Sequence, residues 1–132
     1  MTDARFAHRS ALVIDDEVFS RALIARMLTG LGFRNVYQAS DGATGLTAVG
    51  DLNPDVVVCD VQMKPVNGLA FARTLRDSDN ETHRRLPVLF VTNALDADSY
   101  ATIQDLGDHN LLLKPVTANL LKEALSVCLG NS

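Results

Sequence analysis

Five short apolar runs divide this sequence at regular intervals and constrain its fold more than any other feature. The runs begin at residues 11, 36, 56, 88 and 111, in steps of 20 to 32 residues. After each run the apolar residues recur with the spacing of a helix. Strands and helices that alternate at this distance form βαβ units, whose right-handed crossovers make the strands parallel. The sequence therefore predicts one α/β domain.

The runs are continuous rather than alternating in polarity, as at 11–14, 56–59 and 88–91. Continuous apolar strands are typical of a sheet that helices cover on both faces. Five such units favour a flavodoxin-like doubly wound five-stranded parallel sheet, order 2-1-3-4-5, with five helices. That order opens a crevice at the carboxyl ends of the first and third strands, where sheets of this type bind ligands.

The expected helices follow from apolar spacing and from residues that cap helix ends. The first runs from Val18 to the C-cap residue Gly32, and the last follows the N-cap residue Thr117. We predict two buried helical stripes, one of Phe19, Leu23, Ile24, Met27, Leu28 and Leu31, the other of Leu120, Leu121, Ala124, Leu125, Val127 and Cys128. The polar, aperiodic segment 77–85 is expected to be a solvated connection.

Length and composition exclude several classes of protein. The 132 residues have room for a single domain, 1–132, with a core from about 10 to 129 and no separate output domain. A net charge of -4 does not indicate a basic surface that would bind nucleic acid directly. Apolar runs of four or five residues neither span a membrane nor form a signal peptide, so we expect a cytoplasmic protein. Cys59 and Cys128 lack metal-ligand spacing and are expected to be reduced packing residues.

Polar side chains follow four of the five runs. They are Asp15 and Asp16 after the first, Asp60 after the third, Thr92 after the fourth and Lys114 after the fifth. Because parallel strands share one carboxyl edge, we expect these residues to meet. Three carboxylates at short range repel one another unless a cation lies between them. Oxygen ligands without histidine or cysteine favour Mg²⁺ over zinc.

A metal ion, a lysine and a hydroxyl at one edge suit a phosphoryl group. Mg²⁺ and Lys114 would neutralise its charge, and Thr92 would hydrogen-bond one of its oxygens. Asp60, at the centre of the set, is the expected nucleophile for an aspartyl phosphate.

These residues carry a resemblance to a known family. The set Asp15-Asp16, Asp60, Thr92 and Lys114-Pro115, with Met63 and Gly68 after Asp60, resembles the chemotaxis-regulator-like receiver domain of bacterial two-component response regulators. The similarity covers nearly the whole chain, from about Ser10 to Leu129. It implies a signalling switch rather than an enzyme, in which the phosphohistidine of a sensor histidine kinase or histidine phosphotransfer protein phosphorylates Asp60.

The resemblance also implies roles for single residues. Asp16, Asp60 and the backbone carbonyl of Gln62 would bind Mg²⁺ directly, with Asp15 acting largely through water. Lys114 would bridge Asp60 and the phosphate, and its peptide bond to Pro115 would be cis. Thr92 would move toward the phosphate and transmit the signal.

Two positions depart from the family pattern. Leu111 occupies the switch position three residues before Lys114, where the family has an aromatic residue, and Asn93 follows Thr92 where the family prefers a smaller one. We therefore expect altered phosphorylation kinetics. A downstream protein is expected to bind the face formed by the helix at 96–106, the strand at 111–113 and the last helix. Tyr100 and Leu111 are candidate surface or hinge residues there, and the resemblance leaves room for dimerisation.

Two alternatives stay open at this point. A pseudo-receiver would bind partners without phosphorylation, and Leu111 is the residue that favours it. A phosphatase of the haloacid dehalogenase type also uses a strand-terminal aspartate with Mg²⁺, but it needs a second carboxylate where this chain has Gln62. Whether the chain acts alone or within a longer regulator is not decided by its residues.

Overall fold

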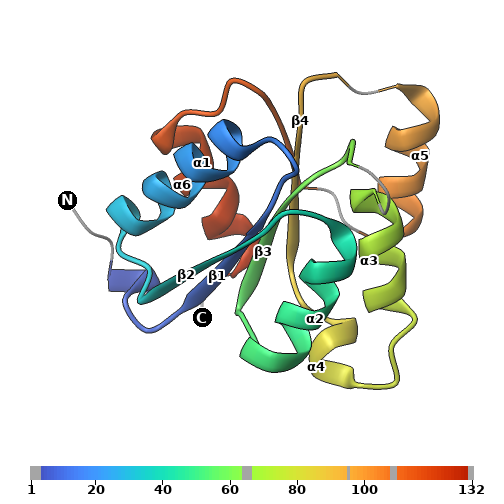
Figure 1. Ribbon diagram of the computed structural model, residues 1–132, viewed down its shortest axis with the longest axis horizontal. Coiled ribbons are helices and arrows are strands. Elements are labelled where there is room, and N and C mark those ends of the chain that lie inside the picture. Colours follow the sequence, from blue (N-terminus) through green and yellow to red (C-terminus); the bar gives the residue numbers. More distant parts are fainter. Residues whose placement is uncertain (1–3, 64–66, 95, 108–109, 131–132) are drawn as a thin grey trace.

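The computed structural model describes residues 4–63, 67–94, 96–107 and 110–130. All five predicted strands are present and form one parallel sheet in the order β2-β1-β3-β4-β5, as predicted. They are β1 (Ser10–Ile14), β2 (Asn35–Ala39), β3 (Val56–Asp60), β4 (Val88–Thr92) and β5 (Leu111–Leu113). The carboxyl ends of the strands lie toward the top of Figure 1.

Helices cover both faces of this sheet. After the 3-10 turn η1 (Ala4–Phe6), the helices are α1 (Val18–Leu31), α2 (Gly42–Leu52), α3 (Gly68–Arg76), α4 (Glu81–Arg84), α5 (Ala97–Asp105) and α6 (Ala118–Cys128). Helices α1 and α6 lie on one face, and α2, α3 and α5 lie on the other (Figure 1). The doubly wound prediction is confirmed.

The described residues contain six α-helices instead of the five predicted. The extra one, α4, lies within the segment 77–85 that we expected to be a connection. The side chain of Asn80 caps it by accepting a hydrogen bond of 3.2 Å from the backbone N–H of His83. Because α4 has four residues and buries none of them, it leaves no apolar period in the sequence.

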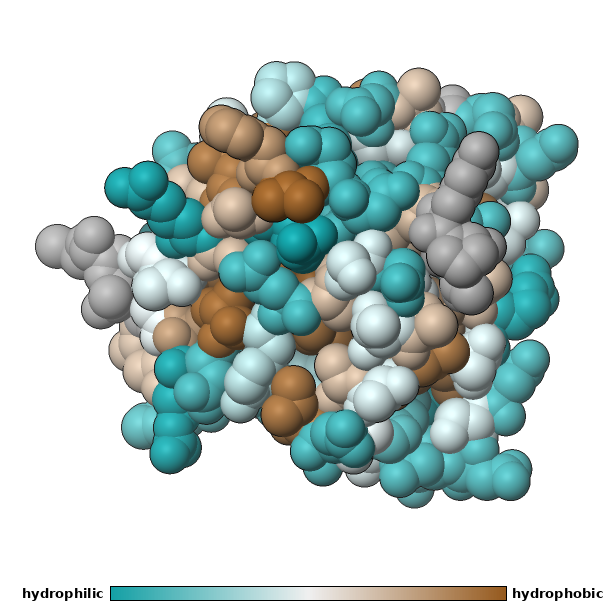
Figure 2. Space-filling model, in the orientation of Figure 1, coloured by the Kyte–Doolittle hydropathy of each residue, from teal (hydrophilic) through white to brown (hydrophobic). Residues whose placement is uncertain are grey.

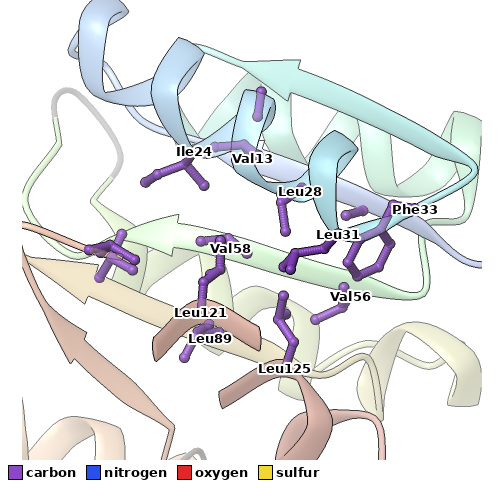
Figure 3. Packing of buried hydrophobic residues seen from close by; sticks show 14 of the residues in the cluster. Val13, Ile24, Leu28, Leu31, Phe33, Val56, Val58, Leu89, Leu121 and Leu125 are labelled. Carbon is purple, nitrogen blue, oxygen red and sulfur yellow. The ribbon is translucent and has the colours of Figure 1, made fainter. Parts of the chain in front are cut away.

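Alternating strand side chains form two buried clusters, one on each face of the sheet. The cluster facing α1 and α6 includes Val13, Val58, Leu89, Leu28, Leu121 and Leu125, whose side chains converge in Figure 3. The cluster facing α2, α3 and α5 includes Leu12, Val57, Phe90, Phe71 and Ile103. Cys59 is buried in the second cluster and Cys128 packs against the first, which confirms them as packing residues.

The predicted stripe of α1 is partly wrong. Ile24, Leu28 and Leu31 are buried, but Phe19 is 79% exposed and Leu23 is 48% exposed. These two side chains instead line a shallow hollow beside Pro115 and Val116, at the start of the last helix. Figure 2 shows the resulting apolar surface over this part of α1.

The stripe predicted for α6 is also too wide. Leu121 and Leu125, one helical turn apart, are fully buried, whereas Leu120 is 45% exposed and Val127 is 70% exposed. At about 100° per residue, Val127 points roughly 200° away from Leu125 and therefore faces solvent.

Candidate functional site

Three predicted carboxylates do meet at the carboxyl edge of the sheet. Asp15 follows β1 and Asp60 ends the neighbouring strand β3, whose Cys59 pairs with Ile14. Carboxylate oxygens of Asp15, Asp16 and Asp60 all lie within 4.8 Å of one another. Asp15 and Asp60 are buried and Asp16 is exposed. Such a cluster of oxygen donors could hold a hard metal ion.

Lys114 connects two of these acids from the end of β5. Its Nζ donates to Oδ2 of Asp15 at 2.9 Å and to Oδ2 of Asp60 at 3.3 Å. Its backbone N–H donates to the carbonyl oxygen of Thr92 at 2.8 Å, which holds the start of the β5–α6 loop against β4. The following peptide bond, Lys114–Pro115, is cis.

The two bridged acids have pKa values that depart from the ordinary value in opposite directions. For Asp60, burial raises the pKa, the Lys114 ammonium lowers it and the Asp15 charge raises it, with a net increase. For Asp15, burial also raises the pKa, but hydrogen bonds from Lys114 and from the Glu17 backbone outweigh burial and lower it. The acid with the lowered pKa, Asp15, is also the one to which Lys114 makes its shorter contact.

An open cavity of about 310 Å³ lies beside these acids. It is lined by Asp16, Glu17, Ser20, Asp60, Gln62, Asn93 and Lys114. The backbone N–H of Gln62 donates to Oδ1 of Asp60 at 3.2 Å, which orients the carboxylate next to the cavity. Ser20 was missed by sequence reasoning, because a serine one turn into a helix carries no signal of its own.

Glu17 also has a role that the sequence did not reveal. Although it is the third acid in a row, its side chain caps α1 by accepting from the backbone N–H groups of Phe19, at 3.1 Å, and Ser20, at 2.6 Å. Its position directly before the first helical residue could have predicted this capping role. Its negative charge therefore compensates the positive end of the α1 dipole.

The other predicted residues lie around this centre. Thr92 is buried, and its hydroxyl donates to the carbonyl oxygen of Ala94 at 2.9 Å. Leu111, opposite Phe90 in the sheet, is half-buried and packs against the cluster under α5. Tyr100 on α5 is 52% exposed.

Gly68 is required by a close approach behind Asp60. A Cβ at this position would overlap the backbone carbonyl oxygen of Asp60 and lie 3.1 Å from Sγ of Cys59. The backbone N–H of Gly68 donates to the carbonyl of Val61 at 3.0 Å, and the neighbouring Asn67 caps α3. The absence of a side chain thus lets α3 start directly against the end of β3.

The sequence of this chain matches a model of a known protein family. The model of the response regulator receiver domain matches residues 11–126. The chain therefore belongs to the response regulator receiver domain family, whose members are signalling switches of two-component systems. That membership implies kinases upstream and partners downstream in general terms.

Two curated relatives illustrate the range of this family. The chemotaxis protein CheY of Pseudomonas aeruginosa is 34% identical over 114 residues, which cover 86% of this chain and 90% of that protein. The Regulator of RpoS of Escherichia coli is 32% identical over 122 residues, which cover 92% of this chain but 35% of that longer protein.

Solved structures support the fold. The chemotaxis protein CheY4 of Vibrio cholerae aligns with a TM-score of 0.83 at 24% identity, covering 92% of this chain and 99% of that one. A response regulator receiver protein from Pseudomonas putida also gives a TM-score of 0.83 at 24% identity, with 92% and 98% coverage. Among the described residues, no helix is long and apolar enough to cross a membrane.

Proposed function

We propose that this chain is the phosphoacceptor of a two-component phosphorelay, with Asp60 as its phosphorylation site. The observation that carries the proposal is the bridge of Lys114 between Asp15 and Asp60, beside Asp16 and an open cavity. A carboxylate oxygen of Asp60 attacks the phosphorus of a phosphohistidine. The new O–P bond forms as the P–N bond breaks, and the electron pair stays on the imidazole nitrogen.

Asp15, Asp16, Asp60 and the backbone carbonyl of Gln62 would hold Mg²⁺, which neutralises charge on the phosphoryl group when bound. The donor set fits this ion, since the clustered side chains are all carboxylates. Lys114 already contacts Asp60 and would contact the phosphoryl oxygens as well. Asn93 lines the same cavity and would restrict access to it.

The donor would be a sensor histidine kinase or a histidine phosphotransfer protein that docks beside the cavity. Exposed Phe19 and Leu23 of α1 border a hollow of about 150 Å³ that shares Glu17, Ser20 and Lys114 with the acidic cavity. An apolar surface at this place suits a protein that must bring a histidine to Asp60. Phe19→Ser should slow transfer from a phosphorylated protein donor and leave labelling by acetyl phosphate unchanged. Equal slowing with both donors would contradict this docking site.

The signal would leave through Thr92 and the face formed by α5, β5 and α6. To reach a phosphoryl group, the Thr92 hydroxyl must exchange its bond to the Ala94 carbonyl for one to a phosphoryl oxygen. Half-buried Leu111 would repack in response, and exposed Tyr100 and Leu113 would contact a downstream protein in the cytoplasm. Residues 1–132 would act as one receiver domain through such protein contacts.

Labelling tests the phosphorylation site directly. Acetyl phosphate with Mg²⁺ should add one phosphoryl group to the wild type and none to Asp60→Asn, as read by intact-protein mass. Equal labelling of both proteins would remove Asp60 from this role. No labelling of either would indicate a pseudo-receiver, and rapid consumption of the donor without a lasting adduct would indicate a phosphatase.

A further inference from the structure

Arg21 joins three elements next to the acidic cluster. Its Nη1 donates to the backbone carbonyl oxygen of Asp15 at 2.8 Å, and its Nε lies 3.3 Å from Oε1 of Gln38 on β2. Its own backbone N–H donates to the carbonyl of Glu17 at 3.0 Å, one helical turn earlier. The half-buried guanidinium thus ties the start of α1 to the carboxyl ends of β1 and β2.

This contact completes the hydrogen bonding of Asp15. The backbone N–H of Asp15 donates to Ala39 at 3.2 Å, its Oδ1 accepts from the N–H of Glu17 at 3.0 Å, and its Oδ2 accepts from Lys114 at 2.9 Å. Strand β1 ends at Ile14, so the Asp15 carbonyl lies past the last paired residue of the strand. In the described part of the chain, Arg21 supplies the hydrogen-bond donor for this carbonyl.

We propose that Arg21 is a positioning residue for the cation site at Asp15, Asp16 and Asp60. By holding the peptide that joins Asp15 to Asp16, it sets the direction of both carboxylates toward Asp60. The planar guanidinium is suited to this task because its donors lie in one rigid plane and reach two acceptors at once. The inference rests on the proposed function, since it assigns Arg21 to the Mg²⁺ site of that proposal.

Positioning and charge act on Mg²⁺ affinity in opposite directions. A guanidinium near three carboxylates competes electrostatically with a second cation, so loss of its charge alone would strengthen Mg²⁺ binding. Loss of its hydrogen bonds would let the Asp15–Asp16 peptide turn and would weaken Mg²⁺ binding. The sign of the change therefore separates the two effects.

Two substitutions use this difference. Arg21→Lys keeps the charge but not the planar pair of donors, whereas Arg21→Gln also removes the charge. Isothermal titration of the metal-free proteins with MgCl₂ should show that both variants bind about threefold to tenfold more weakly than the wild type. Arg26→Gln, exposed on the same helix, is the matched control for a lost charge and should bind within about twofold of the wild type. Gln38→Ala should weaken binding less than either Arg21 variant.

Several outcomes would overturn this role. Tighter binding by Arg21→Gln together with wild-type binding by Arg21→Lys would show that charge alone matters. A lower melting temperature with unchanged Mg²⁺ affinity would make Arg21 a purely structural contact. If the wild type binds Mg²⁺ and accepts a phosphoryl group while both variants match it, this inference fails and the proposed function stands. If the wild type binds no Mg²⁺, both fail.

Discussion

Replacement of Gly68 by alanine tests how tightly the backbone is packed behind the phosphorylation site. The added Cβ would overlap the carbonyl oxygen of Asp60 and come within 3.0 Å of its carbonyl carbon. Both atoms belong to the backbone of a central, fully buried strand, so neither can move aside as the end of a flexible side chain could. Either α3 or the end of β3 must shift.

The size of the effect follows from the cost of overpacking, which is about 1–3 kcal/mol. At about 2.1 cal/mol/K per residue, a chain of 132 residues has an unfolding entropy of roughly 0.28 kcal/mol/K. The melting temperature of Gly68→Ala should therefore fall by about 4–11 °C. Because Asp60 moves relative to Lys114, phosphoryl uptake should fall as well.

Two other glycines are matched controls for this measurement. Nothing lies within 4 Å of a Cβ built at Gly30 in α1 or at Gly50 in α2. Alanine at either helical position should stabilise the fold by about 0.5–1 kcal/mol, or roughly 2–4 °C. Scanning calorimetry of the three variants compares them under identical conditions. A melting temperature for Gly68→Ala at or above that of the wild type would refute the argument from backbone contact.

Two further predictions concern the charges at the site. Lys114→Met leaves the buried Asp15 and Asp60 without their cation, so it should lower the free energy of unfolding by about 3–5 kcal/mol at neutral pH. Mg²⁺ should restore part of this loss. Denaturant titrations that give equal midpoints for the variant and the wild type would contradict the prediction. The raised folded-state pKa of Asp60 means that its contribution to stability is present below the unfolded pKa of about 3.8 and is lost as pH rises through the folded value. Without metal, Asp60→Asn should therefore melt at a higher temperature than the wild type at pH 7, with a difference that shrinks toward pH 3.5, and a difference independent of pH would argue against it.

The sheet could be predicted from the sequence because each strand is a continuous apolar run ended by a polar residue. The strand order then determines which strand ends are neighbours, so Asp15, Asp16, Asp60 and Lys114 can be assigned to one edge of the sheet from the sequence alone. Their closeness is a property of topology, and topology is strongly limited for parallel strands joined by helices.

The exposure of single side chains and the partners of single hydrogen bonds could not be predicted in this way. The helical period contains Phe19 as well as Leu28, but it does not reveal that Phe19 is exposed while Leu28 is buried. Residue type likewise did not reveal the partners of Arg21 and Glu17, because both side chains act through hydrogen bonds to backbone groups near the start of α1. The same holds for α4, which depends on the cap at Asn80.

Strand β5 has three residues and lies at the edge of the sheet, and none of the three is fully buried. The carboxylates, by contrast, follow the interior strands β1 and β3. The cation and the anions of the site therefore belong to regions of different local stability. Local opening of β5 would withdraw Lys114 and leave the carboxylates in place, so the open state would be the more anionic one. The rate of amide hydrogen exchange in β5 should therefore change when a cation or a phosphoryl group occupies the acidic pocket.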